Sequence, residues 1–255
     1  MFKDYHNKGF VILEDAGLPE SDITLALQSV HRVMAGQYNT GIRPWAEIDV
    51  NNPEKVQRIS QIHMADTNLY RLLTDRRIGR LLADVTGARQ IRLGASQLYF
   101  KAPNSGEGGV VGFHRDSHHF PYFADGMFSA WIPLSDVNHD SGALTFIEGS
   151  HQWQKRVDSS GAQIQQYQQQ RLSLKHEYTL EDWREHDAIV PAGGIGIHHK
   201  DVIHGSAKNS SDQPRCLLGF TLLTDQLQLD PNAQDYGYAD IMGDDSYCPI
   251  IYPQD

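Results

Sequence analysis

The sequence predicts a mainly β protein with flanking helices, in which an antiparallel sandwich or barrel follows a helical N-terminal part. Apolar residues recur at spacings of three and four in the first ninety residues, which is typical of amphipathic helices. From Ile91 onward, short apolar or alternating runs are broken by glycine, proline and asparagine, as in antiparallel strands and their turns. With 255 residues, 40% of them hydrophobic, the chain can bury one core, so we expect a single domain spanning residues 1–255.

Two N-terminal segments carry the helical pattern. The segment PESDITLALQSVHRVM begins with helix-initiating residues, Pro19 to Asp22, and then places apolar residues on one face. The segment DTNLYRLLTDRRIGRLLADVTG repeats the pattern, and Gly87 is suited to end it. We therefore expect residues 1–90 to be mostly helical packing elements that contribute no chemistry.

Five runs within residues 91–228 are expected to be strands with their turns, forming the β core. They are IRLGASQLYFKAP, MFSAWIPLSDV, GALTFIEGSH, AIVPAGGIGIHH and CLLGFTLLTDQ. An insertion at about residues 152–186 interrupts them. We expect its glutamine-rich start to be mobile and its TLEDW stretch to form a short helix capped by Thr179. Residues 229–255 are expected to form an extension that folds over the β core.

Composition excludes several classes of function. A formal charge of −10 disfavours nucleic acid, because binding to phosphates requires lysine and arginine. No run approaches the roughly 18 apolar residues of a membrane helix, and MFKDYHNKGF does not resemble a signal peptide, so we expect a cytoplasmic protein without a membrane partner. Two cysteines, Cys216 and Cys248, are expected to be buried thiols. The sequence leaves the oligomeric state open, including a homo-oligomer.

A candidate metal site begins in GFHRDSHHF. His114 and Asp116 are two residues apart, so on an extended strand they point to the same face. A third ligand is expected from His204, which follows a later strand run. Two imidazoles and one carboxylate suit Fe(II), which would keep three positions open. Zinc with a third imidazole from His118 or His119 stays open at this point.

Arg215 favours iron with 2-oxoglutarate over zinc. It follows His204 by a short distance and falls at the start of the next strand run. A planar guanidinium can hold the far carboxylate of 2-oxoglutarate by two hydrogen bonds, and Ser206 can add a hydroxyl donor. A surface position after the proline turn is the alternative for Arg215 alone. Together with the three ligands, the pattern predicts an Fe(II) centre that uses 2-oxoglutarate and O₂.

Several motifs in order resemble the phytanoyl-CoA dioxygenase family of Fe(II)/2-oxoglutarate-dependent oxygenases. They are YHNKGFVIL, GFHRDSHHFPYF, SAWIPLSDVNHDSGALTFIEGSH and VPAGGIGIHHKDVIHGSAKNSSDQPR. The resemblance implies a double-stranded β-helix, a cupin-like jelly roll with iron at its open end. It implies His114, Asp116 and His204 as iron ligands and Arg215 with Ser206 as the clamp for 2-oxoglutarate.

The resemblance also suggests residues around the co-substrate and the substrate. Trp131 matches a tryptophan that lines the co-substrate pocket, although a strand tryptophan is also commonly a core residue. Gln97, and less directly Tyr99, fall where the family places contacts with 2-oxoglutarate. Beyond the metal ligands, the segment SHHFPYFADG is expected at the mouth of the pocket. Its candidates for substrate contact are His118, His119, Phe120 and Tyr122, each of which also suits a structural role.

The predicted reaction is oxidation of an unactivated C–H bond of a small molecule, with release of succinate and CO₂. Because Asp116 occupies the position that related halogenases leave for a halide, hydroxylation is favoured over halogenation. The acidic chain lacks a basic cluster near the mouth, which favours an amino acid-like or natural-product intermediate over an acyl-CoA. The alternatives are a zinc- or manganese-dependent cupin-type isomerase or hydrolase, and a non-catalytic jelly roll that binds a small molecule.

Overall fold

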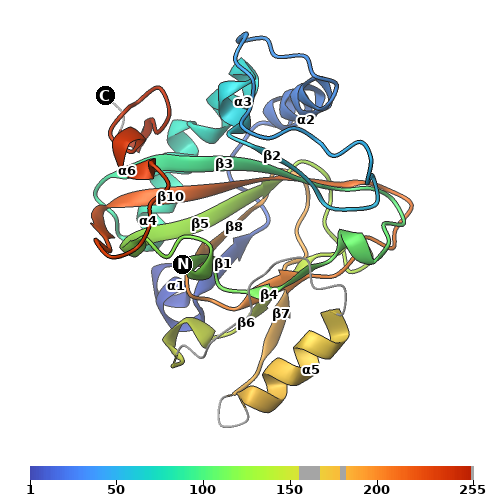
Figure 1. The fold of residues 1–255 in the computed structure, drawn as a ribbon, viewed down its shortest axis with the longest axis vertical. Coiled ribbons are helices and arrows are strands. Elements are labelled where there is room, and N and C mark those ends of the chain that lie inside the picture. The colour runs from blue at the N-terminus through green and yellow to red at the C-terminus, as the bar shows by residue number, and fades with distance from the viewer. Residues whose placement is uncertain (155–166, 179–181, 254–255) are drawn as a thin grey trace.

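Two antiparallel β-sheets face each other in the computed structural model of the chain, which describes residues 1–154, 167–178 and 182–253 (Figure 1). The larger sheet has the strand order β1-β8-β5-β10-β3-β11, with β2 also paired to β3. The smaller sheet has the order β4-β9-β6-β7. The larger sheet comprises β1 (Phe10–Leu13), β2 (Gln57–Ser60), β3 (Ile91–Lys101), β5 (Phe123–Pro133), β8 (Ile195–His199), β10 (Arg215–Leu229) and β11 (Ile250–Tyr252). The smaller comprises β4 (Val111–His114), β6 (Leu144–Ile147), β7 (Glu185–Asp187) and β9 (His204–Ser206).

The chain alternates between the two sheets as it proceeds. Strands β3, β5, β8 and β10 belong to the larger sheet, and the strands β4, β6 and β9 that separate them belong to the smaller one. This alternation is the connectivity of a double-stranded β-helix. The predicted jelly roll is therefore confirmed, and its five expected strand runs correspond to β3, β5, β6, β8 and β10.

Helices cover the outer side of each sheet (Figure 1). Helices α2 (Glu20–Met34), α3 (Thr67–Leu73) and α4 (Arg76–Thr86) share one apolar core with the larger sheet. Helix α5 (Tyr167–Glu177) packs on the smaller sheet, where Tyr167 stacks on Phe113. The remaining helices are α1 (Phe2–Lys8), α6 (Tyr238–Ile241) and the 3₁₀ turns η1 (Ile62–Met64), η2 (Glu107–Gly109), η3 (Asp116–His118) and η4 (Ser150–Gln152).

The N-terminal helical prediction holds for α2 and needs refinement further on. The periodic segment that ends at Gly87 forms two helices instead of a continuous one. The carboxylate of Asp75 accepts the backbone N–H of Arg77, so a new helix begins there. Gly87 ends α4 with a φ of 77°, a left-handed conformation that glycine adopts without strain. The N-terminal region also contains two strands, β1 and β2, whose backbones pair with β8 and β3 of the larger sheet.

Two later segments contain regular structure that the sequence did not predict. Part of the glutamine-rich insertion forms α5, because Tyr167 and Leu174 are seven residues apart and both are buried against the smaller sheet. Thr179 lies outside the described residues. The C-terminal extension adds β11 to β3, and Cys248 and Cys216 are buried free thiols, as predicted. No helix among the described residues is both long and apolar enough to cross a membrane.

Candidate metal centre

Strand pairing in the smaller sheet brings the three predicted metal ligands together. His114 ends β4 and His204 begins β9, and these two residues are direct partners in the β4–β9 register. Asp116 follows β4 and begins η3, which turns its carboxylate back toward both imidazoles. One ligand atom from each of the three residues lies within 4.8 Å of the others. The described residues therefore contain a site with two nitrogen donors and one oxygen donor.

Backbone carbonyls orient the two imidazoles toward this point. Nδ1 of His114 lies 2.8 Å from the carbonyl of Gly112, and Nδ1 of His204 lies 3.1 Å from that of Val202. Because a carbonyl only accepts, each Nδ1 carries the proton and each Nε2 presents its lone pair. The two Nε2 atoms lie 3.5 and 3.6 Å from Oδ1 of Asp116. Both rings are thus fixed in the tautomer that binds a metal through Nε2.

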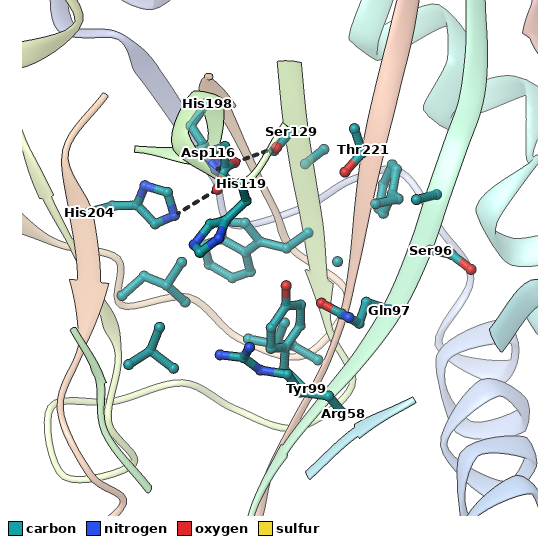
Figure 2. A pocket seen from close by; sticks show the side chains of 18 of the residues that line it. Arg58, Ser96, Gln97, Tyr99, Asp116, His119, Ser129, His198, His204 and Thr221 are labelled. Atoms are coloured by element: carbon teal, nitrogen blue, oxygen red, sulfur yellow. Dashed lines mark hydrogen bonds and ion pairs between the residues drawn. The ribbon is translucent and has the colours of Figure 1, made fainter. Parts of the chain in front are cut away.

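The two carboxylate oxygens of Asp116 have different surroundings. Ser129 Oγ donates to Oδ2 at 2.6 Å, and Nε2 of His198 lies 3.0 Å from the same atom (Figure 2). Oδ1 faces the two ligand imidazoles. Burial raises the pKa of this carboxyl, but the neighbouring imidazoles of His204, His114 and His198 hold it well below its usual range. Asp116 is therefore ionised, with Oδ1 available to a metal.

His198 is a site residue that the sequence analysis missed. Its side chain is 5% exposed and its ring centroid lies 4.6 Å from that of His204, yet its Nε2 is directed at the oxygen that faces away from the other two imidazoles. It therefore holds the carboxylate instead of completing the ligand set. The sequence offered one signal for this inward position. His198 lies two residues after Gly196 in β8, so the strand period places both on one face.

The donor set fits iron. Two imidazoles and one carboxylate on one side of an ion leave open positions for a chelating co-substrate and O₂. A structural zinc site would need a fourth ligand, usually cysteine or histidine. His119 lies beside the site, with its ring centroid 5.2 Å from that of His114, but neither it nor His118 belongs to the ligand cluster found among the described residues.

A cavity of about 340 Å³ opens between the two sheets beside the three ligands. Seven of the residues expected near co-substrate or substrate line it: Arg215, Ser206, Gln97, Tyr99, Trp131, His119 and Phe120. His118 and Tyr122 are absent from the described wall. Tyr122 is only 2% exposed and packs with Phe123 and Met127, so its contact with substrate stays a prediction.

Arg215 and Ser206 form one buried end of the cavity, and a buried lysine that the sequence analysis missed contacts Ser206. The Arg215 guanidinium donates from Nη1 to the carbonyl of Gly142, whereas its buried Nε has no partner among the described residues. Nζ of Lys101 donates to Ser206 Oγ at 2.7 Å. Burial lowers the pKa of Arg215 to about 10, so it stays charged at neutral pH. An unpaired donor on a buried cation fits a carboxylate at this end.

The remaining co-substrate candidates line the wall between this end and the metal ligands. Gln97 lies on β3 and donates to Ser60 Oγ at 3.0 Å. Trp131 on β5 pairs with Gly196 on β8, and a Cβ at that glycine would overlap the indole ring. The glycine therefore allows the ring to lie flat against β8 and form the floor of the cavity.

Comparisons with known proteins agree with this geometry. The sequence profile of phytanoyl-CoA dioxygenase (PhyH) matches residues 5–216. A Stutzerimonas stutzeri protein described as a probable alpha-ketoglutarate-dependent hypophosphite dioxygenase is 23% identical over 224 residues, which cover 86% of this chain and 76% of that protein.

Solved structures share the fold. The non-heme alpha-ketoglutarate-dependent carbocyclase SnoK from nogalamycin biosynthesis has a TM-score of 0.72 at 20% identity, covering 94% of this chain and 88% of that one. The epimerase SnoN, solved with Fe³⁺, alpha-ketoglutarate and nogalamycin RO, has a TM-score of 0.68 at 19% identity, with 92% and 86% of the two chains covered. The profile match covers most of this chain, and the chain therefore belongs to the phytanoyl-CoA dioxygenase family of iron- and 2-oxoglutarate-dependent oxygenases.

Proposed function

We propose that this protein is a dioxygenase that uses Fe(II), 2-oxoglutarate and O₂ to oxidise an unactivated C–H bond of a small molecule, releasing succinate and CO₂. The observation that carries this proposal is one cavity with a metal triad at one side and an unpaired, buried guanidinium nitrogen at the other. When bound, iron and 2-oxoglutarate supply the oxidising power that protein side chains lack.

The side chains of the cavity bind and orient the reactants. His114, Asp116 and His204 hold iron from one side, and the hydrogen bonds from Ser129 and His198 keep the carboxylate in place. At the other end, Arg215 can donate a hydrogen bond to the far carboxylate of 2-oxoglutarate from Nε, which has no partner among the described residues. Ser206 lines the same end, and Lys101 donates to its hydroxyl, so the clamp combines a guanidinium with a hydroxyl that an amine holds in place.

Asp116 supports hydroxylation over halogenation. Its carboxylate lies within reach of both imidazoles, so the position that a halide would need is taken by a ligand of the protein. We expect the product to gain oxygen in buffers containing chloride or bromide. Mass spectrometry of the product in both salts tests this point, and incorporation of the halide would contradict it.

The size and lining of the cavity support a small substrate. About 340 Å³ must accommodate both 2-oxoglutarate and the part of the substrate that reacts. Aromatic side chains of Phe120 and Tyr238 line the cavity as well. The relatives are described as acting on hypophosphite or within nogalamycin biosynthesis, so this architecture serves dissimilar compounds. We favour an amino acid-like or natural-product intermediate.

Succinate formation tests the proposed reaction. Purified protein with Fe(II), 2-oxoglutarate and O₂ is expected to release succinate when small amino acids, hydroxy acids and natural-product intermediates are supplied. His114→Ala and Asp116→Ala should release none, because each removes a ligand. An exposed histidine on α5, changed in His176→Gln, is the matched control. Equal succinate release from wild type and both ligand variants would contradict the proposal.

A further inference from the structure

Four aromatic side chains from three separate segments meet at one edge of the cavity. Phe120 and Tyr238 line the cavity, whereas Tyr122 and Trp45 contact Tyr238 from outside the described wall. The rings of Tyr238 and Tyr122 are stacked, with centroids 5.8 Å apart and an interplanar angle of 25°. The Trp45 ring lies 6.0 Å from that of Tyr238 at an angle of 66°. We call these four side chains the aromatic rim.

The fold holds Tyr238 in place. It begins α6 in the C-terminal extension, and Met242, directly after that helix, packs in one apolar cluster with the buried Tyr122. The backbone carbonyl of Tyr122 accepts the N–H of Asp230 at 2.9 Å, which ties the start of the extension to the same place. A ring that is already fixed loses little conformational freedom when a ligand binds to it.

The aromatic rim is separate from the co-substrate clamp. Arg215 begins β10, whereas Leu223, which packs with Tyr122 in the cluster behind the rim, lies eight residues further along the same strand. At a rise of about 3.3 Å per residue, the two positions are roughly 26 Å apart along β10. A molecule that contacts the rim therefore does not compete with the far carboxylate of 2-oxoglutarate.

The metal site adjoins the aromatic rim. The backbone N–H of Phe120 donates to the carbonyl of Asp116 at 3.2 Å, so the rim begins directly after this metal ligand. Ser129 donates to the Asp116 carboxylate and pairs with Thr221, which lines the cavity from β10. Figure 2 shows these residues on the side of the cavity away from Tyr99. A substrate at the rim thus reaches the side of the metal that faces away from the clamp.

The rim offers no positive charge to a ligand. Among the described residues that line the cavity, the charged side chains other than histidines are Arg58, Asp116 and Arg215. Burial, and then the charges of Arg215 and Arg58, lower the pKa of Lys101, so both guanidiniums act on the co-substrate end. Residues 229–255, which include Tyr238, contain six aspartates and no lysine, arginine or histidine. An anionic group would therefore be disfavoured at the rim.

We propose that Tyr238 stacks against a planar, uncharged ring of the substrate, so that the enzyme acts on a natural-product intermediate with an aromatic or conjugated ring. This inference rests on the proposed oxygenase function and narrows its substrate class. Aromatic pairs are more stable than their buried area alone predicts. Tyr238 is half-buried and lines the cavity, so part of its ring surface is available to a ligand. A zwitterionic amino acid would gain little from this surface.

Binding of a matched set of probes tests the inference without turnover. Full-length protein loaded with Mn(II) and 2-oxoglutarate under nitrogen is titrated by calorimetry with 2-naphthamide, its saturated counterpart decahydro-2-naphthamide, and the anion 2-naphthoate. We expect the planar amide to bind the wild-type protein about 2- to 10-fold more tightly than the saturated amide, the range typical of an aromatic pair. The anion should bind more weakly than the planar amide.

Variants assign the preference for a planar ring to Tyr238. Tyr238→Leu keeps an apolar side chain but removes the aromatic face, so it should bind the two amides with similar affinity, whereas Tyr238→Phe should keep the preference. The control is Tyr236→Leu, since Tyr236 is 72% exposed, lies in the same segment and is outside the described cavity wall. This control should keep the preference. The affinity of Tyr238→Leu for 2-oxoglutarate should stay within about twofold of wild type, since the clamp is distant.

Four results would overturn the inference. They are failure of 2-naphthamide to bind the wild type, binding of the saturated amide or the anion at least as tightly as the planar amide, a planar preference that persists in Tyr238→Leu, and loss of 2-oxoglutarate binding in that variant. Failure of the oxygenase proposal gives a different result. In that case the wild-type protein with Mn(II) does not bind 2-oxoglutarate at all, whatever its response to 2-naphthamide.

Discussion

Asp116 depends on two neighbours that the metal would not contact. Ser129 and His198 both bind Oδ2, and this fixes the plane of the carboxylate so that Oδ1 faces the imidazoles. Residues that orient metal ligands typically contribute about 10- to 100-fold to metal affinity. The ligand geometry at this site is therefore a property of at least five side chains.

Changing His198 to alanine should weaken Mn(II) binding by about 10- to 100-fold, because Oδ2 loses a partner and the carboxylate can rotate. Calorimetry with Mn(II) measures the effect, and the Ser129→Ala variant should show a loss of the same sign. His176→Gln serves as the control, since its imidazole is exposed on α5. Unchanged Mn(II) affinity in both His198→Ala and Ser129→Ala would show that Asp116 needs neither neighbour.

Replacement of Arg215 by alanine should chiefly raise the KM for 2-oxoglutarate, by about 10- to 100-fold, with a smaller effect on kcat. The reason is that its free Nε can bind the far carboxylate, which is remote from the reacting bond. Initial rates at varied 2-oxoglutarate measure the two constants separately. A fall in kcat at unchanged KM would contradict this role, and Arg215→Lys should recover part of the affinity.

The sequence predicted the residues that carry recognisable spacing and missed those that depend on distant pairing. His114 and Asp116 form a local motif, and His204 is their distant partner. The register of β4 with β9 brings the three together, as expected. Gln97, Tyr99 and Lys101 occupy every second position along β3. The strand period therefore places Lys101 on the same face as the other two, and its inward position could have been predicted. Arg58, which lines the cavity from β2, could not be predicted, because β2 is four residues long and only its pairing with β3 turns the side chain inward.

At the scale of elements, the indole of Trp131 on β5 can lie against β8 because of one glycine. Gly196 lies against the indole of Trp131, and no other residue type fits there without moving the ring. We expect Gly196→Ala to lower the free energy of unfolding by about 1–3 kcal/mol through overpacking and to weaken 2-oxoglutarate binding.

Urea unfolding and 2-oxoglutarate calorimetry measure the two effects of Gly196→Ala. The double variant Gly196→Ala/Trp131→Phe should recover part of the stability lost, because a smaller ring makes room for the methyl group. Additive losses in the double variant would contradict the proposed overlap of this methyl group with the ring.

Element boundaries show where local pattern is insufficient. The helix periodicity before Gly87 is continuous in sequence, yet Asp75 caps a second helix and divides it. Helix α5 has few apolar residues and many glutamines, so its sequence does not show a helical pattern. Tyr167 and Leu174 nevertheless pack it on the smaller sheet. Strands β1, β2 and β11 have three or four residues each, too few for periodicity to be seen.

Across the whole molecule, His63 links three distant segments. It lies in η1, its Nδ1 is 2.7 Å from Ser96 Oγ on β3, and its Nε2 is 3.1 Å from the carbonyl of Tyr247 in the C-terminal extension. Burial lowers its pKa from 6.5 to about 4. The folded protein therefore resists protonation of this ring, while the unfolded chain takes up the proton at pH values below 6.5.

This difference predicts a loss of stability on acidification. Because the unfolded state binds more protons between pH 6.5 and about 4, the free energy of unfolding falls as the pH falls through this window. The contribution of His63 should be about 2 kcal/mol between pH 7 and pH 5. Urea unfolding of wild type and His63→Gln at both pH values isolates it, and an identical pH dependence in the two proteins would contradict the assignment.

The central claim is that one cavity binds iron through the triad and 2-oxoglutarate through Arg215. Anaerobic addition of Fe(II) and 2-oxoglutarate to the folded protein tests it most directly, since a bidentate chelate on Fe(II) gives a weak visible charge-transfer band. The band should appear in wild type, be absent in Asp116→Ala, and require a higher 2-oxoglutarate concentration in Arg215→Ala. Folded wild-type protein that binds Fe(II) without developing the band would contradict the claim.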